Sequence, residues 1–143
     1  MMKEFDRLKL ENQLCFPLYA AAKEVVGKYQ PYLNKIGLTY TQYITMMVLW
    51  ERKIIGVKEL GERLYLDSGT LTPLLKRLES KGFITRERSV EDERVVNVTI
   101  TEAGGRLKEK AKEVPIQMAR CMPLTMEETQ TLYQLLYKLL RQE

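Results

Sequence analysis

The sequence contains no histidine, the residue on which many catalytic and metal sites depend. This absence excludes Ser-His-Asp and Cys-His catalytic groups and removes most transition-metal sites. Two cysteines, Cys15 and Cys121, are too few to build a zinc site alone. We therefore expect no metal site. We also predict that the protein is not an enzyme and that it carries no cofactor.

Long apolar runs are also missing. No stretch of about 18 apolar residues occurs, so we expect no segment that spans a membrane. Residues 1–7 carry acidic side chains and lack the apolar core of an export signal, which favours a cytoplasmic location. A permanent structural disulfide is then not expected, and thiol chemistry becomes an option for the two cysteines.

What the chain does contain is the composition of one globular domain. Its 143 residues are 45% hydrophobic and 29% charged, which suits a single domain with its own core. The formal net charge of +4 permits binding to nucleic acid but does not require it.

The spacing of apolar residues predicts a mostly helical chain. A first helix is expected over 10–35, and its regular part should start close to Asn12–Leu14, because Pro17 is tolerated only near a helix start. This leaves Cys15 in or beside the first turn. Thr41 is expected to cap the second helix. The next helices are expected over roughly 41–52, 57–64 and 69–81.

The second half of the chain combines a hairpin with two more helices. Two β-rich runs, 83–88 and 95–100, are joined by a polar loop and indicate a hairpin. Thr101 should cap a fifth helix that reaches about 119, with a kink or break at Pro115. A last helix should follow Thr125 and Glu128, which have capping-box spacing. It carries an apolar stripe of Leu132, Leu135, Leu136, Leu139 and Leu140.

Three short helices followed by a two-stranded wing form the winged helix-turn-helix arrangement. In the helix expected over 69–81, four leucines at i, i+3, i+4 and i+7 predict one buried stripe. Its other face combines hydroxyls and Gly69 at the start with cations further along, as a helix that contacts base edges and phosphates requires. The predicted DNA-contacting residues of this helix are Ser68, Gly69, Thr70, Thr72, Pro73, Lys76 and Arg77, and Lys81 continues the same face.

The hairpin extends this basic surface. Arg86 and Arg88 lie in its first strand, and Arg94 lies at its tip, where a guanidinium could enter a narrow minor groove. Asp92 could hold Arg94 in an extended pose by a charge-assisted hydrogen bond. Taken singly, each feature also suits a solvated amphipathic helix and a charged hairpin without a ligand; their combination favours DNA.

Two segments carry a resemblance to a known family. Leu60–Glu79 and the wing segment Arg88–Arg94 closely resemble the MarR family of winged-helix regulators. Within that family, Asn12–Phe16, Leu38–Tyr40 and Leu66–Leu74 look like the repressors that sense organic hydroperoxides. The similarity covers nearly the whole chain.

The resemblance implies a homodimer that binds a palindromic operator in double-stranded DNA. In a single domain, the helices in 10–36 and 104–143 would form the dimer interface, and residues 40–101 would form the DNA-binding region. It also implies that organic hydroperoxide is the effector and that Cys15 is the redox sensor. Tyr29 and Tyr40 would hydrogen-bond the Cys15 thiolate, and Phe16 and Tyr19 would line the same pocket.

Helix geometry adds a condition to this site. Tyr19 follows Cys15 by four residues and shares its helix face. Tyr29 would lie roughly 21 Å further along a straight helix at ~1.5 Å rise per residue. A contact between Cys15 and Tyr29 therefore predicts a site that two protomers share.

Two departures from the family pattern concern the thiols. Pro17 stands where the family more usually has an apolar residue, and it could alter the pocket locally. Cys121 corresponds only approximately to the second, resolving cysteine of one subgroup. It is therefore either a resolving thiol or an inert buried thiol.

The sequence suggests a redox switch. A helix N-terminus and phenolic hydroxyls can stabilise a thiolate. Attack on a hydroperoxide would give a sulfenic acid, which could condense with Cys121 of the partner or with a small thiol. The new bond would change the spacing of two recognition helices that must lie about one DNA turn (~34 Å) apart.

Three alternatives remain open. The same fold could release DNA on binding a small phenolic or lipophilic ligand, in a pocket lined by the aromatic residues named above together with Trp50. A thiol peroxidase would need proline, threonine and arginine around its cysteine, and neither cysteine has that pattern. A purely structural helical dimer would show no salt-dependent affinity for DNA.

Overall fold

A computed structural model describes residues 1 and 3–141 of the chain. Its elements are η1 (Asp6–Leu8), η2 (Leu10–Asn12), α1 (Cys15–Asn34), α2 (Tyr40–Arg52), β1 (Ile54–Gly56), α3 (Val57–Leu64), α4 (Ser68–Ser80), β2 (Ile84–Arg88), β3 (Val96–Ile100), α5 (Glu102–Ala111), α6 (Val114–Cys121) and α7 (Met126–Leu140), where η marks a short 3₁₀ helix. The predicted mostly helical winged helix-turn-helix fold is confirmed.

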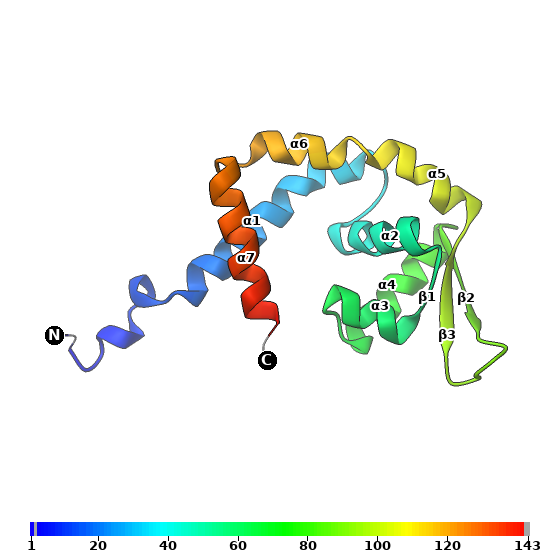
Figure 1. The fold of residues 1–143 in the computed structure, drawn as a ribbon, viewed down its shortest axis with the longest axis horizontal. Coiled ribbons are helices and arrows are strands. Elements are labelled where there is room, and N and C mark those ends of the chain that lie inside the picture. The colour runs from blue at the N-terminus through cyan, green and yellow to red at the C-terminus, as the bar shows by residue number, and fades with distance from the viewer. Residues whose placement is uncertain (2, 142–143) are drawn as a thin grey trace.

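The winged part lies at one end of the molecule, where α2, α3 and α4 are gathered beside a small antiparallel sheet (Figure 1). The predicted hairpin pairs Ile84 with Ile100 and Arg88 with Val96. The sheet also contains a strand that we did not predict: β1 pairs with the other side of β3, so the strand order is β1-β3-β2. Three residues are too few to show the alternation by which a strand is recognised in a sequence.

The N-terminal half of α1 extends away from the winged part together with η1 and η2, and the chain turns sharply between α6 and α7 (Figure 1). The C-terminal part of α1 contacts both α2 and α6. As predicted, regular helix starts late, at Cys15, so Pro17 falls within the first turn, where a missing N–H costs nothing.

Helix ends follow the expected capping chemistry with one exception. Thr101 caps α5 and Thr125 forms a capping box with Glu128, both as predicted. The prediction that Thr41 caps the second helix is wrong. The cap is Thr39, whose hydroxyl accepts from the Gln42 N–H while the Gln42 side chain accepts from the Thr39 N–H. The break predicted near Pro115 is confirmed: α5 ends at Ala111, and the proline lies in the first turn of α6.

The core lies between the helices of the winged part and the sheet. Its fully buried side chains include Leu33, Met46, Leu49, Leu60, Leu71, Leu75, Leu78, Ile84 and Val98. Trp50 donates from its indole N–H to the Gly104 carbonyl at 2.8 Å, which joins α2 to α5. Gly104 is required there, because a Cβ would lie 2.3 Å from the Phe83 carbonyl oxygen.

Outside this core, many apolar side chains are uncovered. No residue of α7, which the structure describes from end to end, is buried, and only Leu33 is buried in α1. The apolar stripe predicted for α7 is therefore present but exposed, with Leu135 54% and Leu139 55% accessible. A single chain thus leaves a large part of its apolar surface in contact with water.

Candidate DNA-binding surface and sensor thiol

A left-handed residue and an aspartate position α4 relative to α3. Tyr65 ends α3 at φ 55°, and Leu66 then donates its N–H to the Gly61 carbonyl, which closes the turn. Asp67 caps α4 by accepting from the Thr70 N–H at 2.7 Å. Gly61 allows the close approach of this turn, because a Cβ there would lie only 3.0 Å from the Leu66 carbonyl oxygen.

The two faces of α4 divide as the sequence predicts. The leucine stripe is buried: Leu71, Leu74, Leu75 and Leu78. The opposite face is exposed and carries Ser68, Gly69, Thr70, Thr72, Pro73, Lys76 and Arg77. Lys81 does not continue this face as we predicted. Its ammonium group turns back to donate to the Gly37 carbonyl and to the Gln42 side chain.

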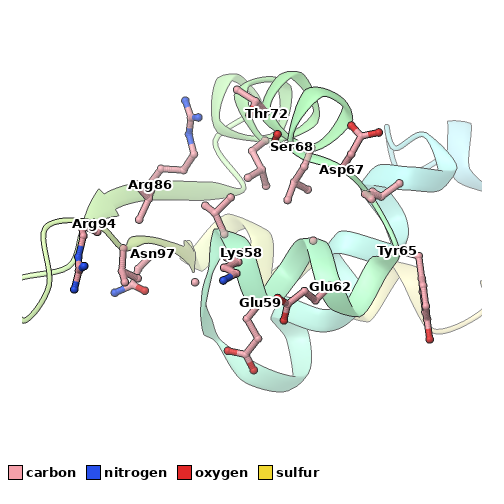
Figure 2. A pocket seen from close by; sticks show the side chains of 18 residues that line it. Lys58, Glu59, Glu62, Tyr65, Asp67, Ser68, Thr72, Arg86, Arg94 and Asn97 are labelled. Carbon is pink, nitrogen blue, oxygen red and sulfur yellow. The ribbon is translucent and has the colours of Figure 1, made fainter. Parts of the chain in front are cut away.

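A groove of about 1380 Å³ lies between α3, the start of α4 and β3. Figure 2 shows Ser68 and Thr72 on its α4 side, Lys58 on α3, and Arg86, Arg94 and Asn97 on the strands and the wing. The acids Glu59 and Glu62 line the α3 side. The groove therefore combines the hydroxyls of α4 and the arginines of the wing, which suit phosphate and base edges, with Lys58 and acidic groups on the α3 side.

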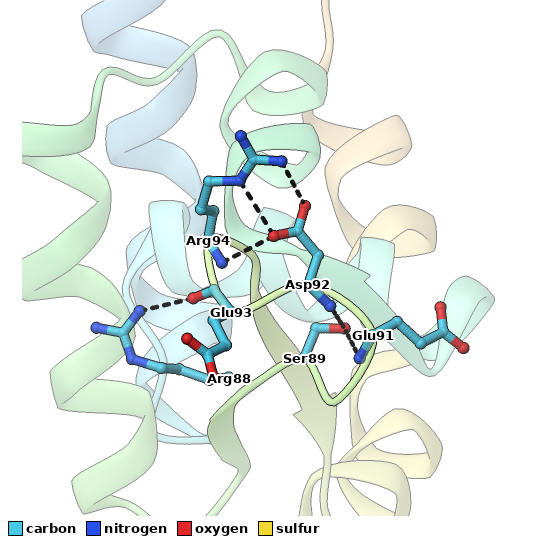
Figure 3. A network of polar contacts seen from close by, with 6 residues as sticks. All are labelled: Arg88, Ser89, Glu91, Asp92, Glu93 and Arg94. Atoms are coloured by element: carbon cyan, nitrogen blue, oxygen red, sulfur yellow. Dashed lines mark hydrogen bonds and ion pairs between the residues drawn. The ribbon is translucent and has the colours of Figure 1, made fainter.

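Hydrogen bonds orient two arginines of the wing, Arg88 and Arg94 (Figure 3). Arg94 is 91% exposed and bonds to Asp92 through both its backbone N–H, at 3.0 Å, and its guanidinium, at 3.2 Å. These bonds lower the pKa of Asp92, the backbone bond most. Arg88 donates to the Glu93 carbonyl at 2.9 Å. The Asp92–Arg94 pairing expected from the sequence is thus present.

Arg86 is arranged differently from the other two. Its guanidinium lies 3.1 Å from a Glu79 oxygen on α4, and this hydrogen bond lowers the pKa of Glu79. This ion pair joins the wing to α4, the helix that carries the predicted DNA-contacting residues. Arg86 therefore joins β2 to α4, whereas the side chain of Arg94 is almost fully exposed to solvent.

Cys15 is the first residue of α1, and its thiol is exposed. The backbone N–H groups of a first helical turn have no intrahelical partner and favour a negative charge beside them. Phe16 and Tyr19 are exposed as well, at 43% and 61%. The Tyr19 ring is within 5.4 Å of the Lys23 ammonium rather than in a closed pocket.

Tyr29 and Tyr40 lie far from Cys15 in the same chain. Because α1 runs unbroken from Cys15 to Asn34, the separation along the helix is the roughly 21 Å expected. The two tyrosine rings meet at 4.9 Å between centroids, and Tyr43 joins them at 5.9 Å from Tyr29. Within one chain, the structure brings Tyr29 and Tyr40 together but leaves both away from the thiol.

Burial raises the pKa of each tyrosine in this cluster, that of Tyr43 to about 12. The hydroxyls therefore stay protonated and are able to donate hydrogen bonds at neutral pH. Tyr43 was absent from our predicted site, although it lies three residues after Tyr40 and thus on the same helix face.

Cys121 ends α6 and is exposed in the single chain, so it is not part of the core of one protomer. Its Sγ lies 3.5 Å from the hydroxyl oxygen of Tyr32, on the C-terminal half of α1. The hydrogen bond and the charge of the thiolate raise the pKa of Tyr32. Sequence reasoning missed Tyr32, which shares no local motif with Cys121.

Among the residues that the structure describes, no three histidine, cysteine, aspartate or glutamate side chains are grouped so as to hold a metal ion. No helix in the same part of the chain is long and apolar enough to cross a membrane.

The chain has close relatives among known regulators. The family model described as transcriptional regulator SarA/Rot matches residues 28–111. The organic hydroperoxide resistance transcriptional regulator of Bacillus subtilis is 50% identical over 140 residues, which cover 98% of this chain and 95% of the relative. The HTH-type transcriptional regulator SarZ of Staphylococcus haemolyticus is 46% identical and covers 86% of this chain and 84% of its own.

Solved structures of AbfR from Staphylococcus epidermidis match at 34% identity. Reduced AbfR bound to DNA has a TM-score of 0.78 and covers 95% of this chain and 94% of that one. Disulfide-formed AbfR has a TM-score of 0.67 and covers 95% and 96%.

The fold and the exposed face of α4 define a winged-helix, DNA-binding transcription regulator. The chain belongs to the MarR type of these regulators, in the family of the organic hydroperoxide resistance transcriptional regulator.

Proposed function

We propose that this protein is a dimeric repressor that releases its operator when an organic hydroperoxide oxidises Cys15. The observation that carries the proposal is the position of this thiol: it is exposed in the first turn of α1, at the uncovered end of a chain half identical to a hydroperoxide-resistance regulator. The proposed DNA contacts are the exposed face of α4 and the wing.

The exposed apolar side chains support the dimer. Leu10, Leu14 and Leu18 lie uncovered at the N-terminal end, and Leu132, Leu135, Leu139 and Leu140 lie uncovered on α7. An apolar surface of this extent on a soluble chain marks an interaction site. Covering it with a second copy would bury the helices in 10–36 and 104–143, and leave residues 40–101 of each copy free to bind DNA.

A shared site follows from the same arrangement. The hydroxyls of Tyr29 and Tyr40 are protonated donors that a thiol of their own chain cannot reach. Cys15 of a second protomer could reach them, because α1 would lie in the interface. The tyrosines would then stabilise the Cys15 thiolate and exclude water from it.

The proposed reaction is a nucleophilic displacement on oxygen. The Cys15 thiolate attacks one oxygen of the O–O bond; an S–O bond forms and the O–O bond breaks, so that the hydroperoxide is reduced to an alcohol. The sulfur is oxidised to a sulfenic acid, and the proton lost by the thiol ends on the departing alkoxide. The sulfenic acid then condenses with a thiol and releases water, and that thiol is either Cys121 of the partner or a small molecule.

Release of DNA would follow from a change in the spacing of the two α4 helices. They must lie about one DNA turn (~34 Å) apart to enter successive major grooves. The chain has TM-scores of 0.78 with reduced and 0.79 with overoxidized AbfR, both bound to DNA, and of 0.67 with disulfide-formed AbfR. This difference supports the proposal that the conformation described here is the DNA-binding one and that a disulfide, rather than oxidation of a thiol alone, changes it.

The test compares wild-type protein with Cys15→Ser on an operator selected from a random duplex library. We expect both to bind when reduced, and cumene hydroperoxide to release only the wild type. Cys121→Ser removes the other thiol and tests the second step: release that persists in this variant assigns the condensation to a small thiol, and release that is lost assigns it to Cys121. If Cys15→Ser still released DNA after oxidation, Cys15 would not be the sensor.

A ligand-sensing regulator is the second candidate. The partly buried phenols of Tyr29 and Tyr40 could pack against an aromatic ligand. Trp50 cannot contribute as we expected from the sequence, because it is buried and its N–H is bonded to Gly104. Release by a salicylate-like compound that reductant does not reverse, and that Cys15→Ser retains, would favour this candidate.

A further inference from the structure

Lys81 lies at the C-terminal end of α4. This end of the helix is next to the α1–α2 corner, residues 35–42, where the chain turns from α1 into α2. Its ammonium group donates to the Gly37 carbonyl at 2.5 Å and to the Gln42 side-chain oxygen at 2.9 Å. The first partner belongs to the turn after α1 and the second to α2. One side chain thus connects the end of α4 to the α1–α2 corner, which lies about 40 residues earlier in the sequence.

Both acceptors are held in place by their own surroundings. Gln42 is only 2% exposed, and its side-chain oxygen also accepts from the Thr39 N–H at 3.1 Å. Gly37 has a φ of +71°, a conformation that side chains disfavour, and Leu38 donates back to the Leu33 carbonyl at 3.1 Å. The corner is therefore a fixed structure rather than a pliable loop, and the lysine is bonded to a defined point.

The C-terminal end of α4 has further anchors, but they come from other directions. Arg86 joins Glu79 to the wing, and the Thr101 hydroxyl donates to the Gly82 carbonyl at 2.6 Å. Among the described residues near this end, the Lys81 bonds are the polar links toward α1, the helix that begins at Cys15. Without the Lys81 bonds, α4 would keep its contacts with the wing but would lose its hydrogen bonds to the α1–α2 corner.

We propose that Lys81 is a positioning residue for DNA recognition: it fixes the tilt of α4 on the α1–α2 corner and does not itself contact DNA. The inference rests on the proposed role of α4 as the reading helix. A small tilt at the C-terminal end of α4 displaces its N-terminal end considerably. Ser68, the first residue of α4, lies roughly 18 Å from the last one, at ~1.5 Å rise per residue. A tilt of about 10° at Lys81 would move Ser68 by roughly 3 Å, about one base-pair step.

The test uses an operator that wild-type protein selects from a random duplex library, and versions of it with one base pair added or removed between the half-sites. Lys81→Met removes the ammonium group, Lys81→Arg keeps a charged donor, and Lys76→Met removes a cation of the exposed face. For each variant, three quantities are measured: the affinity for the selected operator, its dependence on salt, and the preference for the original spacing.

We expect Lys81→Met to bind roughly three- to tenfold more weakly, the range that loss of a hydrogen bond gives. Its salt dependence should match the wild type, since no phosphate contact is lost, whereas Lys76→Met should lower the slope by about one. Lys81→Met should also distinguish less well between the three spacings, and Lys81→Arg should restore most of both properties.

A reduced salt slope in Lys81→Met equal to that of Lys76→Met would overturn the inference and make Lys81 a phosphate contact. Wild-type affinity and spacing preference in Lys81→Met would overturn it too. So would a loss of affinity that only follows a loss of folded protein in thermal unfolding. A wild-type protein that enriches no sequence would instead contradict the proposed function itself.

Discussion

The hydroxyl of Tyr32 lies 3.5 Å from the sulfur of Cys121, and this contact places Cys121 beside the C-terminal half of α1. Cys15 begins the same unbroken helix. At ~1.5 Å per residue, the Cα atoms of Cys15 and Tyr32 lie roughly 26 Å apart. A disulfide needs Cα atoms within about 7 Å of each other. The Tyr32 side chain is too short to bring Cys121 that close to Cys15. Cys15 and Cys121 of one chain therefore cannot bond while α1 is intact.

It follows that any Cys15–Cys121 disulfide joins two protomers. We expect hydroperoxide to give covalent dimers of the wild type on a non-reducing gel, and none of Cys15→Ser or Cys121→Ser alone. A mixture of the two variants, unfolded and refolded together, should regain covalent dimers with one disulfide each. Oxidised wild-type monomers that carry an internal Cys15–Cys121 link would contradict this prediction.

Tyr32→Phe should slow the reaction of Cys121 with iodoacetamide. The contact with Cys121 raises the pKa of Tyr32, so the phenol stays protonated near pH 8 and is able to donate a hydrogen bond to the sulfur whenever that is ionised. Removing this bond destabilises the thiolate, so alkylation near pH 8 should slow by roughly two- to fivefold, less than a buried charged hydrogen bond would give.

Mass spectrometry of tryptic peptides measures this rate, with Cys15 in the same sample as the internal standard. Tyr65→Phe, which removes an exposed phenol from the winged part, is the matched control. An equal change at both cysteines would point to a general effect on the fold rather than to the Tyr32 contact.

The ion pair between Glu79 and Arg86 should make the stability of the winged part sensitive to acid. The hydrogen bond from Arg86 lowers the pKa of Glu79 below its ordinary value of 4.5. A lowered pKa in the folded state means that the contribution is complete above 4.5 and is lost as the pH falls through the lower, folded value. Glu79→Gln should therefore show a shallower loss of unfolding free energy below about pH 4.5 than the wild type.

Urea unfolding at several pH values between neutrality and the acid limit of folding measures this difference. Arg86→Gln removes the other half of the pair and should flatten the acid dependence in the same way. Wild-type acid dependence in both variants would mean that the pair is too well solvated to matter, as many exposed ion pairs are.

Local chemistry explains which elements the sequence could predict. The leucine stripe of α4, the threonine caps of α5 and α7 and the break near Pro115 depend on residues within a few positions of one another. All were found where the spacing predicted them. The Thr39 cap was missed, because two threonines lie within three residues at the start of the second helix, and only the return bond from Gln42 shows that Thr39 is the cap.

Contacts between distant segments could not be predicted in this way. Lys81 was placed on the exposed face of α4 by its spacing, yet its ammonium group is bonded to a carbonyl 44 residues away. Tyr32 and Cys121 are separated by 89 residues. Spacing along a helix fixes the direction of Cα–Cβ bonds, but the long, flexible lysine side chain is directed by whichever acceptor the tertiary fold presents.

Asp92 should matter for DNA binding through Arg94 rather than by itself. Its carboxylate accepts from the Arg94 guanidinium at 3.2 and 3.4 Å and from the Arg94 backbone N–H at 3.0 Å. Arg94→Ala should weaken operator binding by roughly tenfold, the range of one lost specific contact. Asp92→Ala should have a smaller effect, because the arginine remains but must be ordered on binding.

A double-mutant cycle measured by fluorescence anisotropy at fixed salt tests this dependence. The double variant should bind no more weakly than Arg94→Ala alone. Additive losses would mean that Asp92 acts independently of Arg94. Val90→Ala, at a fully exposed neighbouring position of the wing, should leave affinity unchanged.

The apolar stripe of α7 should hold the dimer together. Leu135 and Leu139 lie four residues apart on one helix face and are about half exposed in the single chain. Replacing both with glutamate places unpaired charges in the proposed interface, which is strongly unfavourable. We expect the variant to be monomeric at micromolar concentrations in analytical ultracentrifugation, while circular dichroism shows that its helices remain.

Val90→Glu adds a charge at an exposed apolar position outside α7 and should stay dimeric. The monomeric variant should bind a full operator no better than a half-site, because nothing then fixes the distance between two copies of α4. A dimeric Leu135→Glu/Leu139→Glu variant would place the interface elsewhere on the chain. In that case the proposed interface would explain neither the distance between the two α4 helices nor how Cys15 approaches the tyrosines of the other protomer.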